Sequence, residues 1–125
     1  MNDITFGLSI PPSVLPGADP VADARMAEGL GFDFVSASDH PCGTEPTYET
    51  WTMLSWIAAA TSRIRVAARV LGVPYWNPAM VAKMAETFSR LSGGRLFSGW
   101  VEGIRMTSSA PSGWAPSPRA TRSTA

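Results

Sequence analysis

The sequence has very few of the residues that build disulfide frameworks and metal centres. Its 125 residues include one cysteine, Cys42, and one histidine, His40. A single cysteine excludes a disulfide bond within the chain, and a lone histidine without a cluster of further ligands argues against a structural metal site. We therefore expect neither a disulfide bond nor a structural metal site. The scarcity of cysteine fits a reducing cytoplasm.

Neither sign of charge is in excess. Ten Lys and Arg residues balance ten Asp and Glu residues, so the chain has no formal net charge and no electrostatic attraction to nucleic acid or an anionic membrane surface. No apolar run approaches the roughly 20 residues of a spanning helix. The N-terminal segment MNDITFGLSI has an early acid and no basic region, so no signal peptide is expected. We predict a cytoplasmic protein that binds neither nucleic acid nor membrane.

The common phosphate-loop and nucleophile motifs are also absent. The sequence contains no G-x-G-x-x-G, no Walker pattern and no G-x-S-x-G elbow. Its paired glycines, Gly29 with Gly31 and Gly93 with Gly94, follow helix-like segments rather than strands. They indicate helix ends and not a cradle for phosphate.

What the sequence does have is an alternation of strand-like and helix-like segments. Strands are predicted at residues 4–10, 34–37, 64–71 and from 95 onward, and helices at 20–30, 47–60 and 78–92. Two helices begin with an N-cap residue followed by proline, at Asp19–Pro20 and Asn77–Pro78. Strands separated by helices pair in parallel through right-handed crossovers. The sequence therefore predicts an α/β fold around a parallel sheet.

The apolar residues of each helix predict which side is buried. The first helix presents Val21, Ala24, Ala27 and Leu30; the second Trp51, Leu54, Trp56, Ile57 and Ala58; the third Met80, Val81, Met84, Phe88 and Leu91. Such stripes are typical of helices that pack on a sheet. The second helix is so apolar that we expect most of it to be buried.

Candidate chemistry is expected in the loops that follow the strands, because these loops build the sites of parallel α/β folds. Asp39 and His40 end the second strand, where a carboxylate can tune an imidazole for proton transfer. The alternative is that Asp39 caps a turn and His40 is an ordinary loop residue. Cys42 follows closely, but we expect an idle thiol rather than a Cys–His nucleophile.

Aromatic residues offer a second candidate feature. Trp51, Trp56, Tyr75 and Trp76 could form a wall for a flat cofactor. The two tryptophans of the second helix are expected in the core. Tyr75 and Trp76 lie in the loop after the third strand, where exposed aromatic residues often bind ligands, and both interpretations stay open for that pair.

Four stretches of the sequence carry a family resemblance: TFGLSI, AEGLGFDFVSASDH, TSRIRVAARVLGVPYWNP and AMVAKMAETFSRLSGGRL. Together they cover about residues 3–97, and they resemble the N-terminal half of the bacterial luciferase-like monooxygenases, especially their deazaflavin-dependent branch. The last stretch is the most specific. The resemblance implies a partial TIM barrel of about four βα units within residues 1–99.

The resemblance also implies an activity and a site. It points to an oxidoreductase or monooxygenase that uses reduced FMN or a deazaflavin coenzyme on a small organic substrate. Asp39 and His40 would face the cofactor ring, with the histidine as proton donor or substrate contact. Leu71, Gly72, Tyr75 and Trp76 would bind the cofactor, and residues 70–73 would hold a non-proline cis peptide behind the ring.

The sequence departs from that family in its length and its last segment. A complete barrel of this type takes about 250 residues, and strands five to eight have no counterpart. Residues 100–125 form an atypical Ser/Pro-rich segment that we expect to be partly disordered, as if a longer ancestor had been truncated by a changed reading frame or an early stop. Trp76 stands at a position where the family commonly has one of a small set of polar residues.

Four strands of a barrel leave two open sheet edges and one uncovered face. We expect a homodimer that restores eight strands, unless the last segment folds back over the open face. An alternative to the enzyme is a non-catalytic truncated remnant that dimerises and binds flavin-like ligands weakly or not at all. A third option is a different open α/β sheet, in which the last segment supplies a fifth strand.

Overall fold

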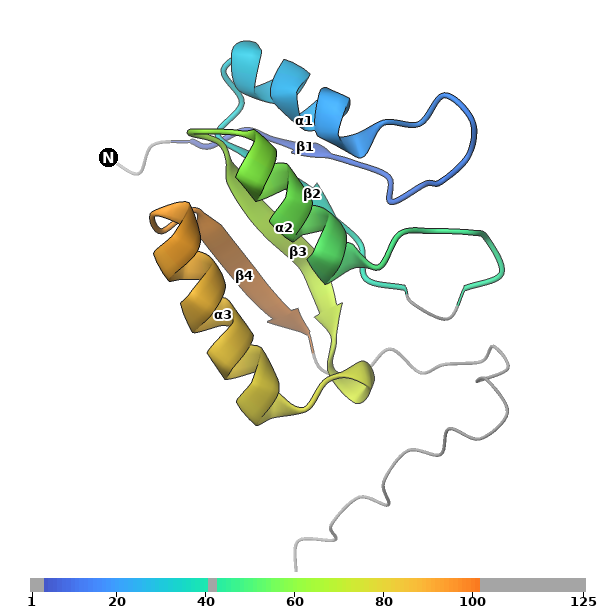
Figure 1. The fold of residues 1–125 in the computed structure, drawn as a ribbon, viewed down its shortest axis with the longest axis vertical. Helices are drawn as coiled ribbons and strands as arrows, with labels where there is room; N and C mark the ends of the chain where they lie inside the picture. The colour runs from blue at the N-terminus through green and yellow to red at the C-terminus, as the bar shows by residue number, and fades with distance from the viewer. Residues whose placement is uncertain (1–3, 41–42, 102–125) are drawn as a thin grey trace, which may run out of the picture.

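The structure, a computed structural model, describes residues 4–40 and 43–101 (Figure 1). Four parallel strands form one sheet in the order β1 (Gly7–Ser9), β2 (Phe34–Ala37), β3 (Arg65–Gly72) and β4 (Leu96–Val101). They are connected by α1 (Pro20–Gly29), α2 (Thr50–Ala60), the 3-10 turn η1 (Val73–Tyr75) and α3 (Pro78–Ser92). The predicted parallel α/β fold is confirmed. It comprises three βα units and a fourth strand, and any helix after β4 lies outside the described residues.

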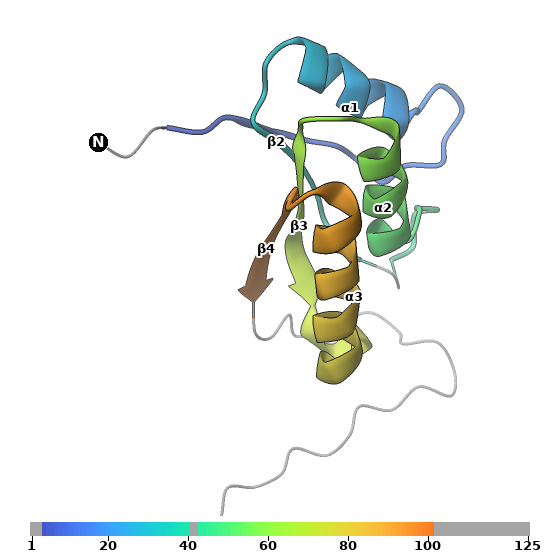
Figure 2. The same ribbon diagram turned by 60° about the vertical axis from the view of Figure 1, so that its left-hand side comes forward.

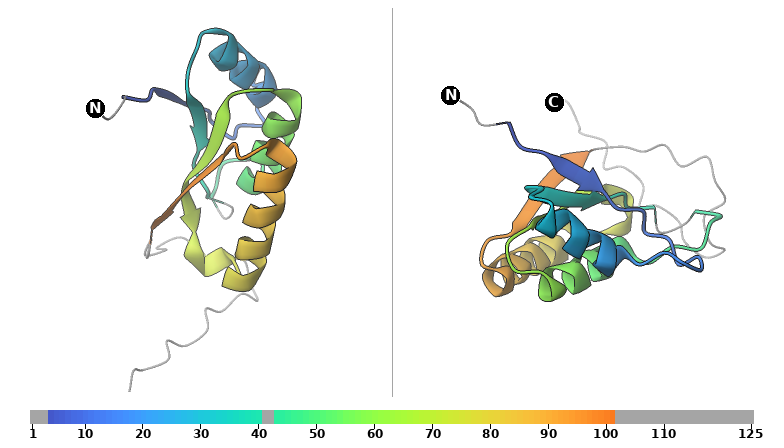
Figure 3. Two further views of the ribbon diagram at one scale, coloured as in Figure 1. Left: turned by 90° about the vertical axis from the view of Figure 1, so that its left-hand side faces the viewer. Right: turned by 90° about the horizontal axis from the view of Figure 1, so that it is seen from above.

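The three helices lie together on one side of the sheet (Figures 2 and 3). This follows from the right-handed connections, which place each helix on the same face as the one before. No described element covers the opposite face of the sheet. The described residues therefore form two layers, with β1 and β4 at the two edges.

The first strand and the second helix are shorter than predicted. β1 contains three residues because only Gly7–Ser9 pair with β2. α2 begins at Thr50 instead of residue 47, since the Glu49 carboxylate accepts hydrogen bonds from the backbone N–H groups of Trp51 and Thr52 at 2.8 and 2.7 Å. The two predicted N-caps, Asp19 and Asn77, are confirmed, because each accepts backbone hydrogen bonds from the first turn of its helix.

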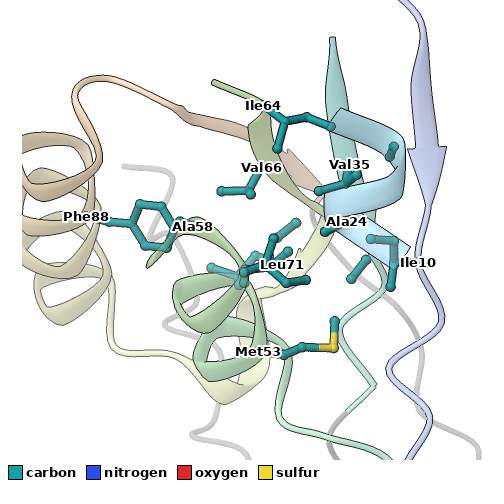
Figure 4. Close-up of a cluster of buried hydrophobic side chains, with 14 of the residues drawn as sticks. Ile10, Ala24, Val35, Met53, Ala58, Ile64, Val66, Leu71 and Phe88 are labelled. Carbon is teal, nitrogen blue, oxygen red and sulfur yellow. The ribbon is translucent and has the colours of Figure 1, made fainter. Parts of the chain in front are cut away.

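The hydrophobic core lies between the sheet and the helices. Figure 4 shows the labelled side chains that meet there, which are Ile10, Val35, Ile64, Val66 and Leu71 from the sheet side and Ala24, Met53, Ala58 and Phe88 from the helices. Alternate residues of β2 and β3, such as Val35, Val66 and Ala68, enter this core, as the period of a strand requires.

Four apolar side chains predicted to be buried are exposed. Trp56 is 71% exposed, Leu30 70%, Met80 57% and Leu91 85%. Each helix touches the sheet along one narrow face only, and these residues lie beyond the edge of that face. The expectation that α2 is buried holds for Leu54, Ile57 and Ala58, but it is wrong for Trp56.

The turns at the amino ends of the strands are tied by charged side chains. The Glu28 carboxylate accepts hydrogen bonds from the backbone N–H groups of Ser62, Arg63 and Ile64, which joins the end of α1 to the turn before β3. The Arg95 guanidinium donates to the carbonyls of Ala58 and Ile64. These contacts fix the end of the sheet that lies away from the candidate site.

None of the helices within residues 4–40 and 43–101 is long and apolar enough to cross a membrane.

Candidate functional site

The predicted site residues Asp39 and Gly72 lie at the carboxyl ends of β2 and β3. The loops after β1 and β2 are held together there, because the backbone N–H of Tyr48 donates to the carbonyl of Pro12 at 2.7 Å and Ser13 pairs with Thr47 in an antiparallel bridge. The hydroxyl of Thr50 donates to the carbonyl of Ser38 at 2.5 Å. The start of α2 is thereby fixed beside the end of β2.

Asp39 is the centre of this region. Its side chain is buried, at 2% exposed, and its Oδ2 accepts hydrogen bonds from the backbone N–H of Gly72 at 2.9 Å and from Nε1 of Trp76 at 3.0 Å. Its Oδ1 is buried with no hydrogen-bond partner among the described residues. Asp39 therefore joins the ends of β2 and β3, and its second oxygen lacks a hydrogen-bond partner, which is costly for a buried polar atom.

Gly72 sits where a larger residue would not fit. A Cβ atom at this position would lie 2.7 Å from Cδ2 of Tyr75 and 3.5 Å from Oδ2 of Asp39. The peptide bond between Arg69 and Val70 is cis, where the pairing of β3 with β4 shifts register between Ala68 and Leu71. The resemblance implied a cis bond within residues 70–73, and the observed bond joins the first of these residues to the one before.

Trp76 faces the helix layer. Its ring lies 6.0 Å from that of Trp51 in α2, centroid to centroid, and Trp51 in turn contacts Phe88 of α3 edge-on at 5.9 Å. Trp76 therefore packs against the core while its indole N–H donates to Asp39. The ring is only partly buried, and its contact with a cofactor stays a prediction.

The remaining predicted residues are placed differently. Leu71 is buried in the hydrophobic core, so only its backbone faces the site. His40 is exposed and follows Asp39 directly. Cys42 lies outside the described residues. No group of three or more His, Cys, Asp or Glu side chains in the described part of the chain could hold a metal ion.

Sequence reasoning missed Arg69. This residue is exposed on the face of the sheet opposite the core, and its Nη2 donates to Oγ of Ser9 at 3.4 Å. The available signal was a charged residue inside the otherwise apolar stretch AARVL. Because side chains alternate along a strand, Arg69 is expected on the opposite face of the sheet from Ala68.

The arrangement suits a flat ligand that carries N–H donors. Asp39 has one unpartnered carboxylate oxygen, and the missing side chain of Gly72 leaves room for the Tyr75 ring beside it. Flavin-type rings carry an N–H group beside two carbonyls on their pyrimidine edge, and a carboxylate acceptor matches that N–H group. The residues present therefore fit a flavin or deazaflavin ring.

Comparison with known families agrees with the fold. A family model described as luciferase-like monooxygenase matches residues 6–122. This match extends past the residues 3–97 on which the resemblance was based, and it covers most of the segment from residue 100 onward. The domain boundary at residue 99 stays a prediction.

Individual relatives use two kinds of cofactor. The chain is similar to an FMNH2-dependent dimethylsulfone monooxygenase of Pseudomonas putida, with 32% identity over 87 residues, 64% of this chain and 24% of that protein. It is also similar to an F420-dependent glucose-6-phosphate dehydrogenase of Amycolatopsis mediterranei, with 36% identity over 101 residues, 76% of this chain and 30% of that protein. The chain thus matches less than a third of the length of either relative.

A solved structure shows the same arrangement of elements. The coenzyme F420-dependent tetrahydromethanopterin reductase from Methanopyrus kandleri matches with a TM-score of 0.66 and 25% identity, over 79% of this chain and 27% of that one. The observed sheet and helices therefore correspond to a part of a larger fold in that protein.

Proposed function

The chain belongs to the luciferase-like monooxygenase family, and on that premise we propose that it acts as an oxidoreductase dependent on reduced FMN or a deazaflavin. The reaction is hydride transfer or oxygen insertion on a small organic substrate, in the cytoplasm. Both cofactor classes occur in the names of its relatives. Neither relative fixes the substrate, because the chain matches less than a third of each.

The observation that carries this proposal is the free Oδ1 atom of Asp39. It is buried and unpartnered at the carboxyl end of the sheet, where ligands bind in parallel α/β folds. The other oxygen is held by Gly72 and Trp76, so the carboxylate cannot turn away without losing both hydrogen bonds. Asp39 therefore orients the cofactor ring by accepting a hydrogen bond from its N–H group.

The neighbouring residues have separate roles in the proposal. When bound, the reduced flavin or deazaflavin supplies the hydride or electrons. His40, exposed beside Asp39, contacts the substrate and donates or accepts its proton. Tyr75 borders the ring, and the backbone of Leu71 and Gly72 lines it. Trp76 holds Asp39 in place from the helix side.

The assembly is proposed to be a homodimer. The described sheet has two edge strands and one face that no described element covers, and open edges and faces favour association. A second copy supplies four more strands and closes the barrel.

Titration with FMN and with coenzyme F420, followed by the fluorescence of each ring, tests the proposed function. The wild-type chain should bind one of them saturably. Asp39→Asn keeps a carbonyl oxygen for Gly72 and Trp76 but replaces the free acceptor with an N–H donor, so binding should weaken about tenfold or more. His40→Ala should weaken binding less, because His40 is placed at the substrate.

A matched control comes from the other end of the sheet. Asp33 accepts one backbone hydrogen bond, from the N–H of Phe6 at 2.8 Å, and Asp33→Asn should bind the cofactor as the wild type does. Equal binding by Asp39→Asn and the wild type would contradict the role of Asp39. No binding of either cofactor at high micromolar concentration would favour the non-catalytic remnant.

A further inference from the structure

The open face of the sheet carries a polar row that the proposed chemistry does not use. Ser9 of β1 pairs in register with Ser36 of β2, which pairs with Ala67 of β3. These side chains leave the sheet on the face opposite the core, because their neighbours Leu8, Val35 and Val66 pack on the helix side. Arg69 follows Ala67 by two residues, so it stands on the same face and nearer the carboxyl ends of the strands.

The Arg69 guanidinium reaches back across the sheet from β3 to β1. Its Nη2 donates to Oγ of Ser9 at 3.4 Å, a contact that passes over the central strand β2. Among the described residues Arg69 forms no ion pair, unlike Lys83 and Arg90, which both pair with Glu86. The Asp39 carboxylate at the same end of the sheet is bonded to Gly72 and Trp76 instead.

An unneutralised arginine on this face needs a partner once the barrel is closed. The open face then becomes the interior of the barrel, and a charge withdrawn from water is stable only when it is paired and hydrogen-bonded. The guanidinium fork matches a carboxylate, to which it can donate two parallel hydrogen bonds. One nitrogen of the fork, Nη2, donates to the Ser9 hydroxyl at the end of β1.

We propose that Arg69 and Ser9 form an anion-binding subsite that recognises a carboxylate on the substrate. The inference rests on the proposed function, because it places the substrate beside the Asp39 region at the same end of the sheet. The substrates are small organic acids, which Arg69 selects over neutral compounds.

Binding of benzoate and of its uncharged counterpart benzamide to the full chain, measured by calorimetric titration without any cofactor, tests this subsite. The wild type should bind benzoate about tenfold more tightly than benzamide. Arg69→Met should remove this preference, and Arg69→Lys should keep part of it because a point charge remains without the fork. Circular dichroism of Arg69→Met and Arg69→Lys checks that both variants are folded.

The matched control is Arg65→Met. Arg65 lies four residues before Arg69 on the same strand and the same face. The substitution Arg65→Met therefore removes the same charge, but at the amino end of the sheet. This variant should retain the preference for benzoate. Equal affinity of the wild type for the two probes, or an equal loss in Arg65→Met and Arg69→Met, would overturn the subsite.

A phosphate of the cofactor is the other possible source of an anion. Comparing FMN with riboflavin, which lacks the phosphate, separates the two sources. The ratio of their affinities should be the same in the wild type and in Arg69→Met. A ratio that collapses in Arg69→Met would assign Arg69 to the phosphate and overturn the substrate subsite. Benzoate selectivity without binding of FMN or coenzyme F420 would instead count against the proposed function and leave the subsite standing.

Discussion

At the scale of single residues, Asp39 and Trp76 show how one side chain can serve both the fold and the site. Asp39 ends β2 and accepts hydrogen bonds from Gly72 and Trp76, which lie 33 and 37 residues further along the chain. Trp76 is also packed against Trp51. The position of the free Asp39 oxygen therefore depends on an indole ring that does not itself line the open face.

Replacing Trp76 by phenylalanine should destabilise the protein more than the same change at Trp51. Trp76→Phe deletes a donor to a buried carboxylate, which costs about 1–3 kcal/mol of unfolding free energy in addition to the lost ring volume. Trp51→Phe loses the same volume, but the Trp51 indole donates no hydrogen bond among the described residues. Urea unfolding of the two variants measures the difference. Equal losses would show that the Asp39–Trp76 bond contributes nothing to stability.

At the scale of the elements, the two ends of the sheet differ in how far their polar groups are satisfied by hydrogen bonds. At the amino ends, Glu28 and Arg95 satisfy backbone groups of the turns that follow the helices. At the carboxyl ends, a buried acceptor and an exposed arginine are left available. This division matches the general behaviour of parallel α/β folds, in which the turns after helices serve stability.

Stability should depend on pH through Glu28. Hydrogen bonds from the backbone of Ile64, then Arg63 and Ser62, hold the pKa of the Glu28 carboxyl below its ordinary value of 4.5, although partial burial opposes them. A carboxyl whose pKa is lowered on folding stabilises the folded state above its unfolded pKa, and this contribution is lost as the pH falls through the folded pKa. The contribution of Glu28 is therefore complete at pH 7 and declines below about pH 4.5.

Denaturant unfolding of Glu28→Gln between pH 7 and pH 3 checks this expectation. The variant should be less stable than the wild type at pH 7 by roughly 1–2 kcal/mol, and the gap should narrow below pH 4.5, the ordinary value for this carboxyl. Glu86→Gln is the control, because Glu86 makes only exposed ion pairs with Lys83 and Arg90, which contribute about 0.5 kcal/mol or less. A gap of constant size across this pH range would show that ionisation of Glu28 does not matter.

At the scale of the whole molecule, the main feature of the described residues is a four-stranded sheet that is open at both edges and on one face. All described helices lie on one face (Figure 3), and the other face carries Ser9, Ser36 and Arg69. An eight-stranded closed barrel has no edge strands and a filled interior. Four strands leave two edge strands unpaired and one face of the sheet uncovered by any described element. The proposed dimer and the proposed anion subsite both follow from this geometry.

Sedimentation velocity of the 125-residue chain tests the dimer. We expect a species of twice the 13.3 kDa chain mass. Ser9→Arg, which adds a second positive charge beside Arg69 on the open face, should shift the equilibrium toward the monomer. Ala59→Arg places the same charge at an exposed position of α2 and should not. A compact monomer at all concentrations would exclude association through the open face.

The sequence by itself determined the order of the elements, the caps at Asp19 and Asn77, and the position of Asp39 at the end of a strand. These features depend on periodicity and on contacts within a few residues, so they can be derived locally. Only the tertiary structure decided that Asp39 accepts hydrogen bonds from Gly72 and Trp76. It also decided that Trp56 is exposed and that Arg69 donates a hydrogen bond to Ser9. Each of these depends on which distant segments lie side by side, because burial and partners are set by the pairing of strands and the packing of helices across more than 30 residues of chain.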